Sequence, residues 1–544
     1  MFMKSIRRKV HASAFGFVAI TLASVGFSNI AIAQIVIDTA QTSPEVLTGD
    51  DTVLVTSTGS ITVDPSLFAI NASGFNSVIT LNGPVSATDV IGATPLTTIL
   101  QNGDTYNTLI VGQGGNIFAA EDGSNNDAIG VRQTTVNGLN TVELENATIS
   151  VIAPNNDGLG IDQSNTDGDN IIQFGSNSSI IVNAIEDSLG IRQFQVGGNG
   201  NASITLAAGT KIKINSQLTS GAILQGTDGN GETTITIGSN SQIFANSEFN
   251  EADGVIQFAL GGSAELIVGS GTILNVTAFE RADGVIHGAT ESNVSLGTNS
   301  ILNVVSDTEE AFGLNQFALT GDSSTTILAN SQINVKGATN ATGIFAFASG
   351  SSSFLTLEQG VSIYASGNTA QGVDIDVDSF EMQSSGRIIA HSTNANPESH
   401  GVRMVGDGNS FVNHGSVFAD LAPGSHAILM DGNDNTLSLL TYPVIQGQIT
   451  FGDGGGGFGT DNTLIVGSGF DAAFTVGAAP GELTVLGQGQ PLVVNQIGPN
   501  LFQVLTIDQD DLLRSSSVRM SDDLVRFLQQ HITTRGIQNR SFLY

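Results

Sequence analysis

Gly160-Ile161-Asp162-Gln163 and Gly190-Ile191-Arg192-Gln193 are the segments of sequence that decide the fold. They lie thirty residues apart, and the same order of a small residue, an aliphatic residue and a glutamine recurs at similar intervals on both sides of them. The glutamine positions are Gln101, Gln133, Gln163, Gln193, Gln225, Gln257, His287 and Gln316. The aliphatic positions are Ile99, Val131, Ile161, Ile191, Ile223, Val255, Val285 and Leu314. The small positions are Ala69, Thr98, Gly130, Gly160, Gly190, Ala222, Gly254, Gly284, Gly313, Gly343, Gly372, Gly401 and Ala427.

The spacing and the local pattern together predict a solenoid of short strands. A fixed period of about 20–50 residues is typical of stacked repeats. Within each unit apolar residues alternate with polar ones, as in Ile204-Thr205-Leu206 and, after a turn, Ile212-Lys213-Ile214. Such alternation indicates strands, and helical spacing appears only after about residue 508. We therefore predict an all-β fold, a right-handed parallel β-helix of about 13 rungs of ~30 residues, with a short C-terminal helical segment.

Stacking of the rungs gives each column of similar residues a physical role. Aliphatic columns become internal walls of the solenoid. The glutamine column is expected to form a structural ladder, in which each amide donates to the carbonyl oxygen of its neighbour. His287 is expected to replace a glutamine within that ladder, since an imidazole also forms hydrogen bonds. Two further columns alternate in charge: Arg132, Asp162 and Arg192, and Glu251, Arg281 and Glu310.

The first 33 residues predict a secretory signal. A basic segment from Lys4 to Lys9 precedes an apolar run from Ala14 to Phe27, and Ala31-Ile32-Ala33 forms a cleavage motif before Gln34. The apolar run is too short to cross a bilayer, and no other stretch is long and apolar enough to do so. We expect the Sec machinery to export the chain and the mature protein to have no transmembrane segment.

The charge and the aromatic content of the chain argue against some classes of binding partner. Seventeen basic residues face fifty acidic ones, which gives a formal net charge of −33. Such a surface repels nucleic acid, whose binding requires cationic side chains. The chain has no cysteine, so neither disulfides nor thiol chemistry are expected. It also has no tryptophan and four tyrosines, which argues against an aromatic platform for sugars.

The sequence pattern changes after Ala427. Asp434-Asn435-Thr436-Leu437 and Asp461-Asn462-Thr463-Leu464 repeat one motif, with Ile445-Gln446-Gly447-Gln448-Ile449 and a glycine-rich run between them. This order resembles the C-terminal end of autotransporter (type V secretion) passenger domains, and the apolar spacing after Asp508 resembles their helical linker. We therefore divide the chain into a signal peptide (1–33), a parallel β-helix passenger (34–426), a capping and junction β module (427–507) and a helical linker and tail (508–544).

The chain departs from that family in one respect. Autotransporters end in an outer-membrane barrel of many alternating strands, and the residues after Ile507 do not have this pattern. We expect the translocator barrel to be absent from this chain, so that a separate outer-membrane barrel acts in trans or the protein stays in the periplasm. The resemblance implies a location at the cell surface, on the outer membrane or outside the cell, a surface protein or glycan as ligand, and a role in virulence.

Three groups of residues are candidates for metal binding. Gly456 to Asp461 matches the start of a calcium-binding nonapeptide, which makes Asp453 and Asp461 weak candidate ligands for Ca²⁺, and no other cofactor is expected. A glycine-rich turn is the alternative interpretation. The other candidates are a column of Asp127, Asp157 and Asp187 and the set His400, His414 and His426. Solvated turns and surface-loop histidines, respectively, are the alternatives for these two groups.

No catalytic motif of the common hydrolases occurs in the sequence. The leading hypothesis is therefore a non-enzymatic, adhesin-like rod whose specificity lies in longer loops such as Ala245–Asp253 and Ser306–Phe312. The alternatives are a carbohydrate-active enzyme (a polysaccharide lyase or hydrolase) that uses one β-helix face, and a remnant of a larger autotransporter without its barrel. Residues 427–507 are expected to cap the open end of the core.

Overall fold

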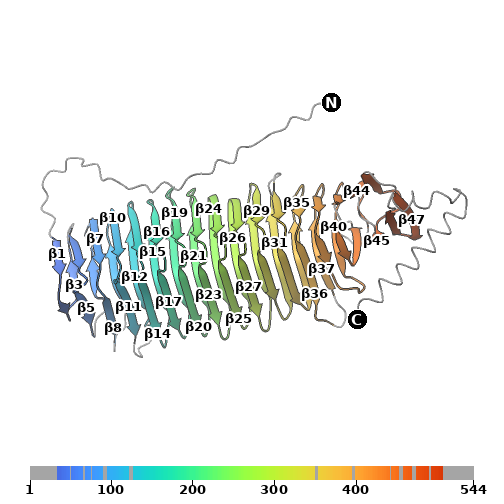
Figure 1. Cartoon of the computed structure of the whole chain (residues 1–544). Coiled ribbons are helices and arrows are strands. Elements are labelled where there is room, and N and C mark those ends of the chain that lie inside the picture. Colours follow the sequence, from blue (N-terminus) through green and yellow to red (C-terminus); the bar gives the residue numbers. More distant parts are fainter. Residues whose placement is uncertain are drawn as a thin grey trace, which may run out of the picture.

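The computed structural model describes residues 34–506, except for 49–50, 65–67, 75, 90–94, 122–125, 350–352, 395–397, 441–442, 453–457, 468–472 and 489–491. It confirms an all-β parallel solenoid of about 13 turns. Figure 1 shows the strands stacked side by side into a rod, from β1 at one end to β47 at the other. The described part contains no helix long and apolar enough to cross a membrane. The predicted signal peptide (1–33) and helical tail (508–544) lie outside the described residues.

A complete turn contributes three strands, so the rod has three faces. The first-face strands are β3 (Glu45–Leu47), β6 (Ile70–Ala72), β9 (Leu96–Asn102), β12 (Ala128–Thr135), β15 (Gly158–Asn165), β18 (Ser188–Gln195), β21 (Ser220–Thr227), β24 (Ala252–Val268), β26 (Ala282–Leu296), β28 (Ala311–Ala318), β31 (Asn340–Ala348), β34 (Thr369–Asp376), β37 (Glu398–Val405), β40 (His426–Asp431) and β43 (Gln448–Gly452). Both β24 and β26 continue around a corner into the second face.

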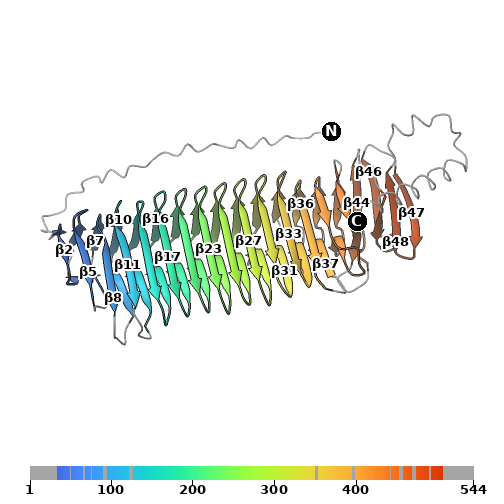
Figure 2. The ribbon, with the colours of Figure 1, turned by 60° about the horizontal axis from the view of Figure 1, so that its bottom comes forward.

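The other two faces are built in the same way. The second-face strands are β1 (Gln34–Ile37), β4 (Thr52–Val55), β7 (Asn76–Leu81), β10 (Tyr106–Val111), β13 (Leu139–Leu144), β16 (Asn170–Phe174), β19 (Ala202–Leu206), β22 (Thr233–Ile237), β29 (Ser323–Ile327), β32 (Phe354–Leu357), β35 (Glu381–Ser384), β38 (Ser410–Asn413), β41 (Thr436–Leu439), β44 (Asn462–Gly467) and β46 (Leu483–Gln488). The third-face strands are β2 (Ala40–Gln41), β5 (Ser60–Val63), β8 (Val85–Asp89), β11 (Asn116–Glu121), β14 (Thr148–Ala153), β17 (Ser179–Ala184), β20 (Lys211–Ser216), β23 (Gln242–Ser247), β25 (Ile273–Ala278), β27 (Ile301–Ser306), β30 (Gln332–Lys336), β33 (Ser362–Gly367), β36 (Arg387–Ser392), β39 (Ser416–Phe418) and β42 (Val444–Gln446). In the turned view of Figure 2 the third-face strands β11, β17, β23, β27 and β33 follow one another along the rod.

Parallel pairing in register places the columns of the sequence side by side. Val131 pairs with Ile161 and Ile161 with Ile191, so that the aliphatic wall runs from rung to rung. These side chains are fully buried, and they belong to one hydrophobic core that extends along the rod. Burial of apolar surface stabilises by about 25 cal/mol per Å². In a chain without disulfides this continuous core is the main source of stability.

The small-residue column faces the opposite wall of the core. A Cβ atom on Gly130 would lie 2.7 Å from Ile149 Cγ2, and one on Gly190 would lie 2.9 Å from Ile214 Cδ1. The first and third faces approach each other so closely here that most side chains would clash. Ala222 nevertheless occupies the same column, so a methyl group fits where the opposing wall leaves room for it.

The stacking pattern changes near the C-terminal end. Parallel pairing continues past Ala427 through β41, β44 and β46. The last strands, β45 (Ala473–Gly477), β47 (Leu492–Gly498) and β48 (Leu501–Thr506), pair antiparallel. Phe474 and Val504 from these strands pack against the end of the main core. The antiparallel segment thus follows the last parallel rungs, and its role as a cap stays a prediction.

Candidate functional site on the first face

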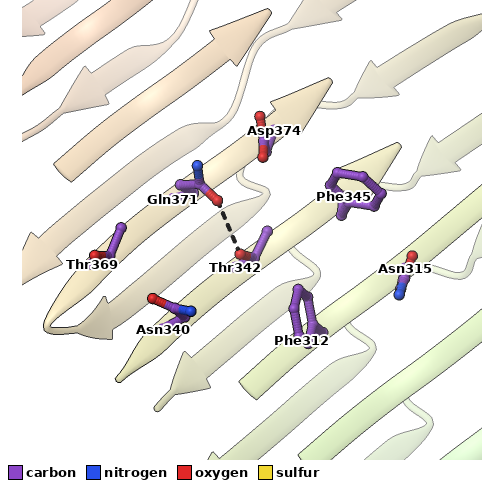
Figure 3. Close-up of a pocket in the computed structure, with 8 residues that line it drawn as sticks. All are labelled: Phe312, Asn315, Asn340, Thr342, Phe345, Thr369, Gln371 and Asp374. Carbon is purple, nitrogen blue, oxygen red and sulfur yellow. Dashed lines mark hydrogen bonds between the residues drawn. The ribbon is translucent and has the colours of Figure 1, made fainter. Parts of the chain in front are cut away.

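The outward side of the first face carries a depression on strands β28, β31 and β34. Its volume is about 420 Å³. Figure 3 shows its lining side chains on three neighbouring strands. The lining residues are Phe312, Asn315, Asn340, Thr342, Phe345, Thr369, Gln371 and Asp374. Aromatic, amide, hydroxyl and carboxylate groups are thus gathered in one recess.

Strand register explains how these residues meet. Phe312 pairs with Thr342 and Thr342 with Gln371, which forms one row across the three rungs. Asn315, Phe345 and Asp374 form a second row three residues further along each strand. Thr342 is only 4% exposed and Asp374 only 5%, although both line the recess. The larger neighbouring side chains, among them Arg403 beside Asp374, therefore cover these two residues from solvent.

An ion pair holds the carboxylate at the edge of the depression. Arg403 Nη1 lies 2.8 Å from Asp374 Oδ1, one rung further along the rod. Burial raises the pKa of Asp374, and the guanidinium of Arg403 opposes that rise. In the same row, nearer the N-terminus, Arg132 and Arg192 both bind Asp162, at 3.0 and 2.8 Å. The expected charge alternation is therefore present in this column.

In the second expected charge column, Arg281 interacts electrostatically with both Glu251 and Glu310. Its ion pair, at 2.7 Å, is with Asp283, two residues further along the chain. Asp283 is the neighbour of Asp253 across one rung. Burial and the charge of Asp283 raise the pKa of Asp253 to about 7. Asp253, with its raised pKa, thus lies beside the ion-paired Asp283 on the first face.

Inside the rod the glutamine column forms hydrogen bonds over five steps. From Gln133 to Gln257, each Nε2 donates to the Oε1 of the preceding glutamine at 2.7 to 2.9 Å. Each amide also donates to a main-chain carbonyl of the next strand, for example Gln133 to Thr141 at 2.9 Å. The ladder therefore satisfies buried amides and ties the first face to the second at the corner.

His287 does not continue this ladder, so that expectation is wrong. Its Nδ1 lies 2.6 Å from the hydroxyl of Ser292. Its Nε2 and Oε1 of Gln257 have no hydrogen-bond partner in the described part of the chain. Burial lowers the pKa of His287 to about 3, so the ring is neutral. The next member, Gln316, donates to the same Ser292 hydroxyl and to Ser324 and accepts from Thr325, so Ser292 links Gln316 to His287.

The structure describes only one of the two predicted calcium ligands. Asp453 lies outside the described residues, and Asp461 is exposed at a bend with φ of 55°. Among the described residues, no three His, Asp or Glu side chains form a group that could hold a metal ion. The calcium site thus remains a prediction.

The aspartate column has a role within the turns. Asp157 Oδ1 accepts the main-chain N–H of Asp187 at 2.9 Å, and Asp187 Oδ1 accepts that of Thr219 at 3.2 Å. Burial raises the pKa of Asp157, and the hydrogen bond from Asp187 opposes this. Asp157 and Asp187 thus each cap a main-chain donor of the next rung, and Asp127 accepts from the Asn156 amide at 2.7 Å, which stabilises the turns.

The interpretation of His400 and His426 as unrelated loop residues is wrong. Both lie in strands and pair across one rung. Each stands directly before a residue of the small column, His400 before Gly401 and His426 before Ala427. Their Nδ1 atoms are 3.4 Å apart. Burial, the neighbouring His426 and Arg403 lower the pKa of His400 to about 4. His414, the third histidine of the predicted set, follows β38 and belongs to a different part of the turn.

The lining of the depression was missed by the sequence analysis. Phe312, Thr342 and Gln371 each stand immediately before a small-column residue, and Asn315, Phe345 and Asp374 each stand two residues after it. That common offset was a usable signal, but the residue types differ from rung to rung. Comparisons with protein-family models, with curated proteins and with solved structures found no match to this chain.

Proposed function

We propose that the chain is a passenger of the autotransporter type, an exported and non-enzymatic β-helical rod that presents its first face for adhesion at the cell surface. The depression on β28, β31 and β34 is the observation that carries this proposal, since it offers a ligand a recess lined by several kinds of polar and aromatic groups. The parallel solenoid and its antiparallel end support the passenger architecture.

The repeated motif near the C-terminus supports the resemblance to passengers. Asn435 Oδ1 accepts the main-chain N–H of Asn409 at 2.7 Å, and Asn462 Oδ1 accepts that of Asn435 at 2.8 Å. All three asparagines are fully buried. The motif thus stacks consecutive turns just before the end of the rod, where a folding seed or cap has to act.

Delivery in this proposal needs two partners. The Sec machinery exports the chain through the predicted signal at 1–33, and an outer-membrane barrel acts in trans. The test is to fractionate cells that express the full chain and to treat intact cells with protease. Degradation on intact cells or recovery from the medium is expected, and confinement to the periplasm would contradict the proposal and favour a remnant.

Asp253 and Asp283 favour a second candidate, a carbohydrate-active enzyme. Neighbouring rungs lie roughly 4.8 Å apart, close to the about 5–5.5 Å between the two carboxyl groups of retaining glycosidases. A protonated Asp253 would act as the acid and an ionised Asp283 as the nucleophile. Release of reducing ends from a panel of polysaccharides, lost in Asp253→Asn, would support this candidate over adhesion.

A further inference from the structure

We infer that the depression on β28, β31 and β34 binds a neutral oligosaccharide that lies along the rod axis. This deepens the proposed function and rests on it for the place where the protein meets its ligand. The lining spans three rungs, roughly 10 Å, which is enough for about two sugar rings. Each step of the argument concerns a different chemical group of the lining.

The absence of tryptophan and the scarcity of tyrosine argue against an aromatic platform for sugars, but at this recess two phenylalanines supply the apolar surface on which a sugar ring can rest. Phe312 and Phe345 are half-buried, so part of each ring faces solvent. The guanidinium of Arg281 lies 5.3 Å from the centroid of the Phe312 ring and holds it in place. Phe345 lies in the central strand of the recess, between Asn315 and Asp374 in its row (Figure 3). A planar ring flanked by polar groups suits a sugar, which has apolar C–H faces and hydroxyl edges.

The amides provide unused hydrogen-bonding capacity. Thr342 donates to Gln371 Oε1 at 3.2 Å, which leaves the Gln371 NH₂ directed to no other described residue. Asn340 Nδ2 donates to Glu310 at 2.8 Å, and its Oδ1 remains available. The Asn315 amide has no side-chain hydrogen bond within the described part of the chain. Amides both donate and accept, which matches the hydroxyl groups of a sugar.

Strand pairing argues against an extended peptide as the ligand. The main-chain groups of β31 are paired with β28 on one side and β34 on the other. A peptide that adds to a sheet needs a free edge with unpaired N–H and C=O groups. The recess offers side chains only, so a ligand with its own donors and acceptors distributed around rings fits it better.

Charge argues against an acidic ligand. The recess contains Asp374, whose partner Arg403 lies one rung away, and Glu310 binds Asn340 at its rim. The whole chain carries a formal net charge of −33. A uronate or sulfated glycan would meet like charge, whereas a neutral sugar pays no such penalty and can donate its hydroxyl protons to the carboxylate.

Titration calorimetry on the purified full chain tests the inference. The probes are neutral tetrasaccharides of glucose, galactose and N-acetylglucosamine, with a galacturonate tetrasaccharide as the acidic probe. At least one neutral probe should bind, with an affinity that does not change in high salt. Phe345→Ala should weaken that binding by about tenfold. Phe347→Ala is the matched control, because Phe347 lies on the same strand, is 42% exposed and is outside the lining.

Each outcome is decisive for the inference. Failure of every neutral probe, binding of galacturonate alone, or an equal loss in Phe347→Ala would overturn it. A thermal melt of each variant shows whether the fold is intact, and Asn315→Ala repeats the test at an uncharged lining residue outside the aromatic pair. If the protein reaches the cell surface but binds no sugar, the proposed function stands and this inference fails. If it binds sugar but stays in the periplasm, the proposed surface function fails and the sugar-binding site stands.

Discussion

One internal column of the rod is filled in two different ways. Between Gln101 and Gln257 it holds buried amides that bond to one another, whereas beyond Gln316 it holds apolar side chains. The apolar members are Ala346, Ile375, Met404, Met430 and Phe451, all buried and paired in the same register. The backbone is the same in both regions, so the fold itself does not require the ladder.

The difference between the two regions shows what buried amide side chains contribute to the choice of strand register. A slip of one residue turns every side chain of a strand to the other face, so in the apolar region it exposes hydrophobic side chains to water. The same slip in the amide region would leave buried N–H and C=O groups without partners, each at a cost of about 1–3 kcal/mol. The amide ladder therefore adds to the penalty for a wrong register over the rungs from Gln101 to Gln257, and the apolar stack mainly supplies burial.

The largest expected effect breaks the ladder in its middle. Gln163→Ala removes the acceptor of Gln193 Nε2 and the donor to Gln133 Oε1, and it also leaves a cavity. We expect the free energy of unfolding to fall by about 3–4 kcal/mol. The measurement is urea denaturation combined with hydrogen exchange of β12, β15 and β18, since a repeat array need not unfold in one step.

Met404→Leu is the matched change in the apolar region. It conserves volume and breaks no hydrogen bond, so we expect a loss below about 1.5 kcal/mol. Equal losses in Gln163→Ala and Met404→Leu would show that the two fillings of the column are energetically equivalent and that the ladder does not specify register.

The next prediction concerns the interruption at His287. The folded-state pKa of about 3 lies below the ordinary value of 6.5. Between these two pH values His287 is therefore protonated in the unfolded chain and neutral in the folded chain. Its contribution to the free energy of unfolding is present above about pH 6.5 and is lost as the pH falls toward 3. The slope is up to about 1.4 kcal/mol per pH unit. His287→Gln should remove that slope and supply a donor for Gln257.

Urea midpoints between pH 4 and pH 7 check this prediction. Asp253 opposes it, because a pKa raised to about 7 makes that group destabilising as the pH rises through the same range. The double variant His287→Gln, Asp253→Asn separates the two groups. An unchanged pH profile in His287→Gln would show that protonation of this ring does not limit folding.

Substitutions in the small-residue column should lower stability by less, whether a glycine is enlarged or an alanine is reduced. In Gly190→Ala the new Cβ would lie 2.5 Å from the carbonyl oxygen of Ala222 and 2.9 Å from Ile214 Cδ1. We expect a loss of about 1–3 kcal/mol from overpacking. Ala222→Gly, in the next rung, should cost only about 0.5–1 kcal/mol through backbone entropy. Thermal melts compare the two, and a gain in stability for Gly190→Ala would contradict the proposed close approach of the two faces.

The sequence predicts those features of the fold whose residue types repeat from rung to rung. The aliphatic, small and glutamine columns were visible because the same residue type returns at the same offset, as from Ile161 to Ile191. The position of His287 was equally visible, but its loss of the ladder depends on the distance from a short imidazole to Ser292. The depression could not be predicted, because the residue types in the column of Phe345 and Asp374 differ from rung to rung and no repeated pattern marks a recess.

The smallest expected effect compares the ion pairs of the two regions. In the amide region Asp162 keeps Arg132 when Arg192→Met removes its second partner, and Arg192 is 38% exposed, so the loss should be below about 0.5 kcal/mol. In the apolar region Arg403→Met leaves the buried Asp374 without its ion pair, so a loss of about 1–2 kcal/mol is expected. Denaturation at low and high salt measures both. Equal small losses would mean that water reaches Asp374, and the floor of the depression would then be wetter than its 5% exposure indicates.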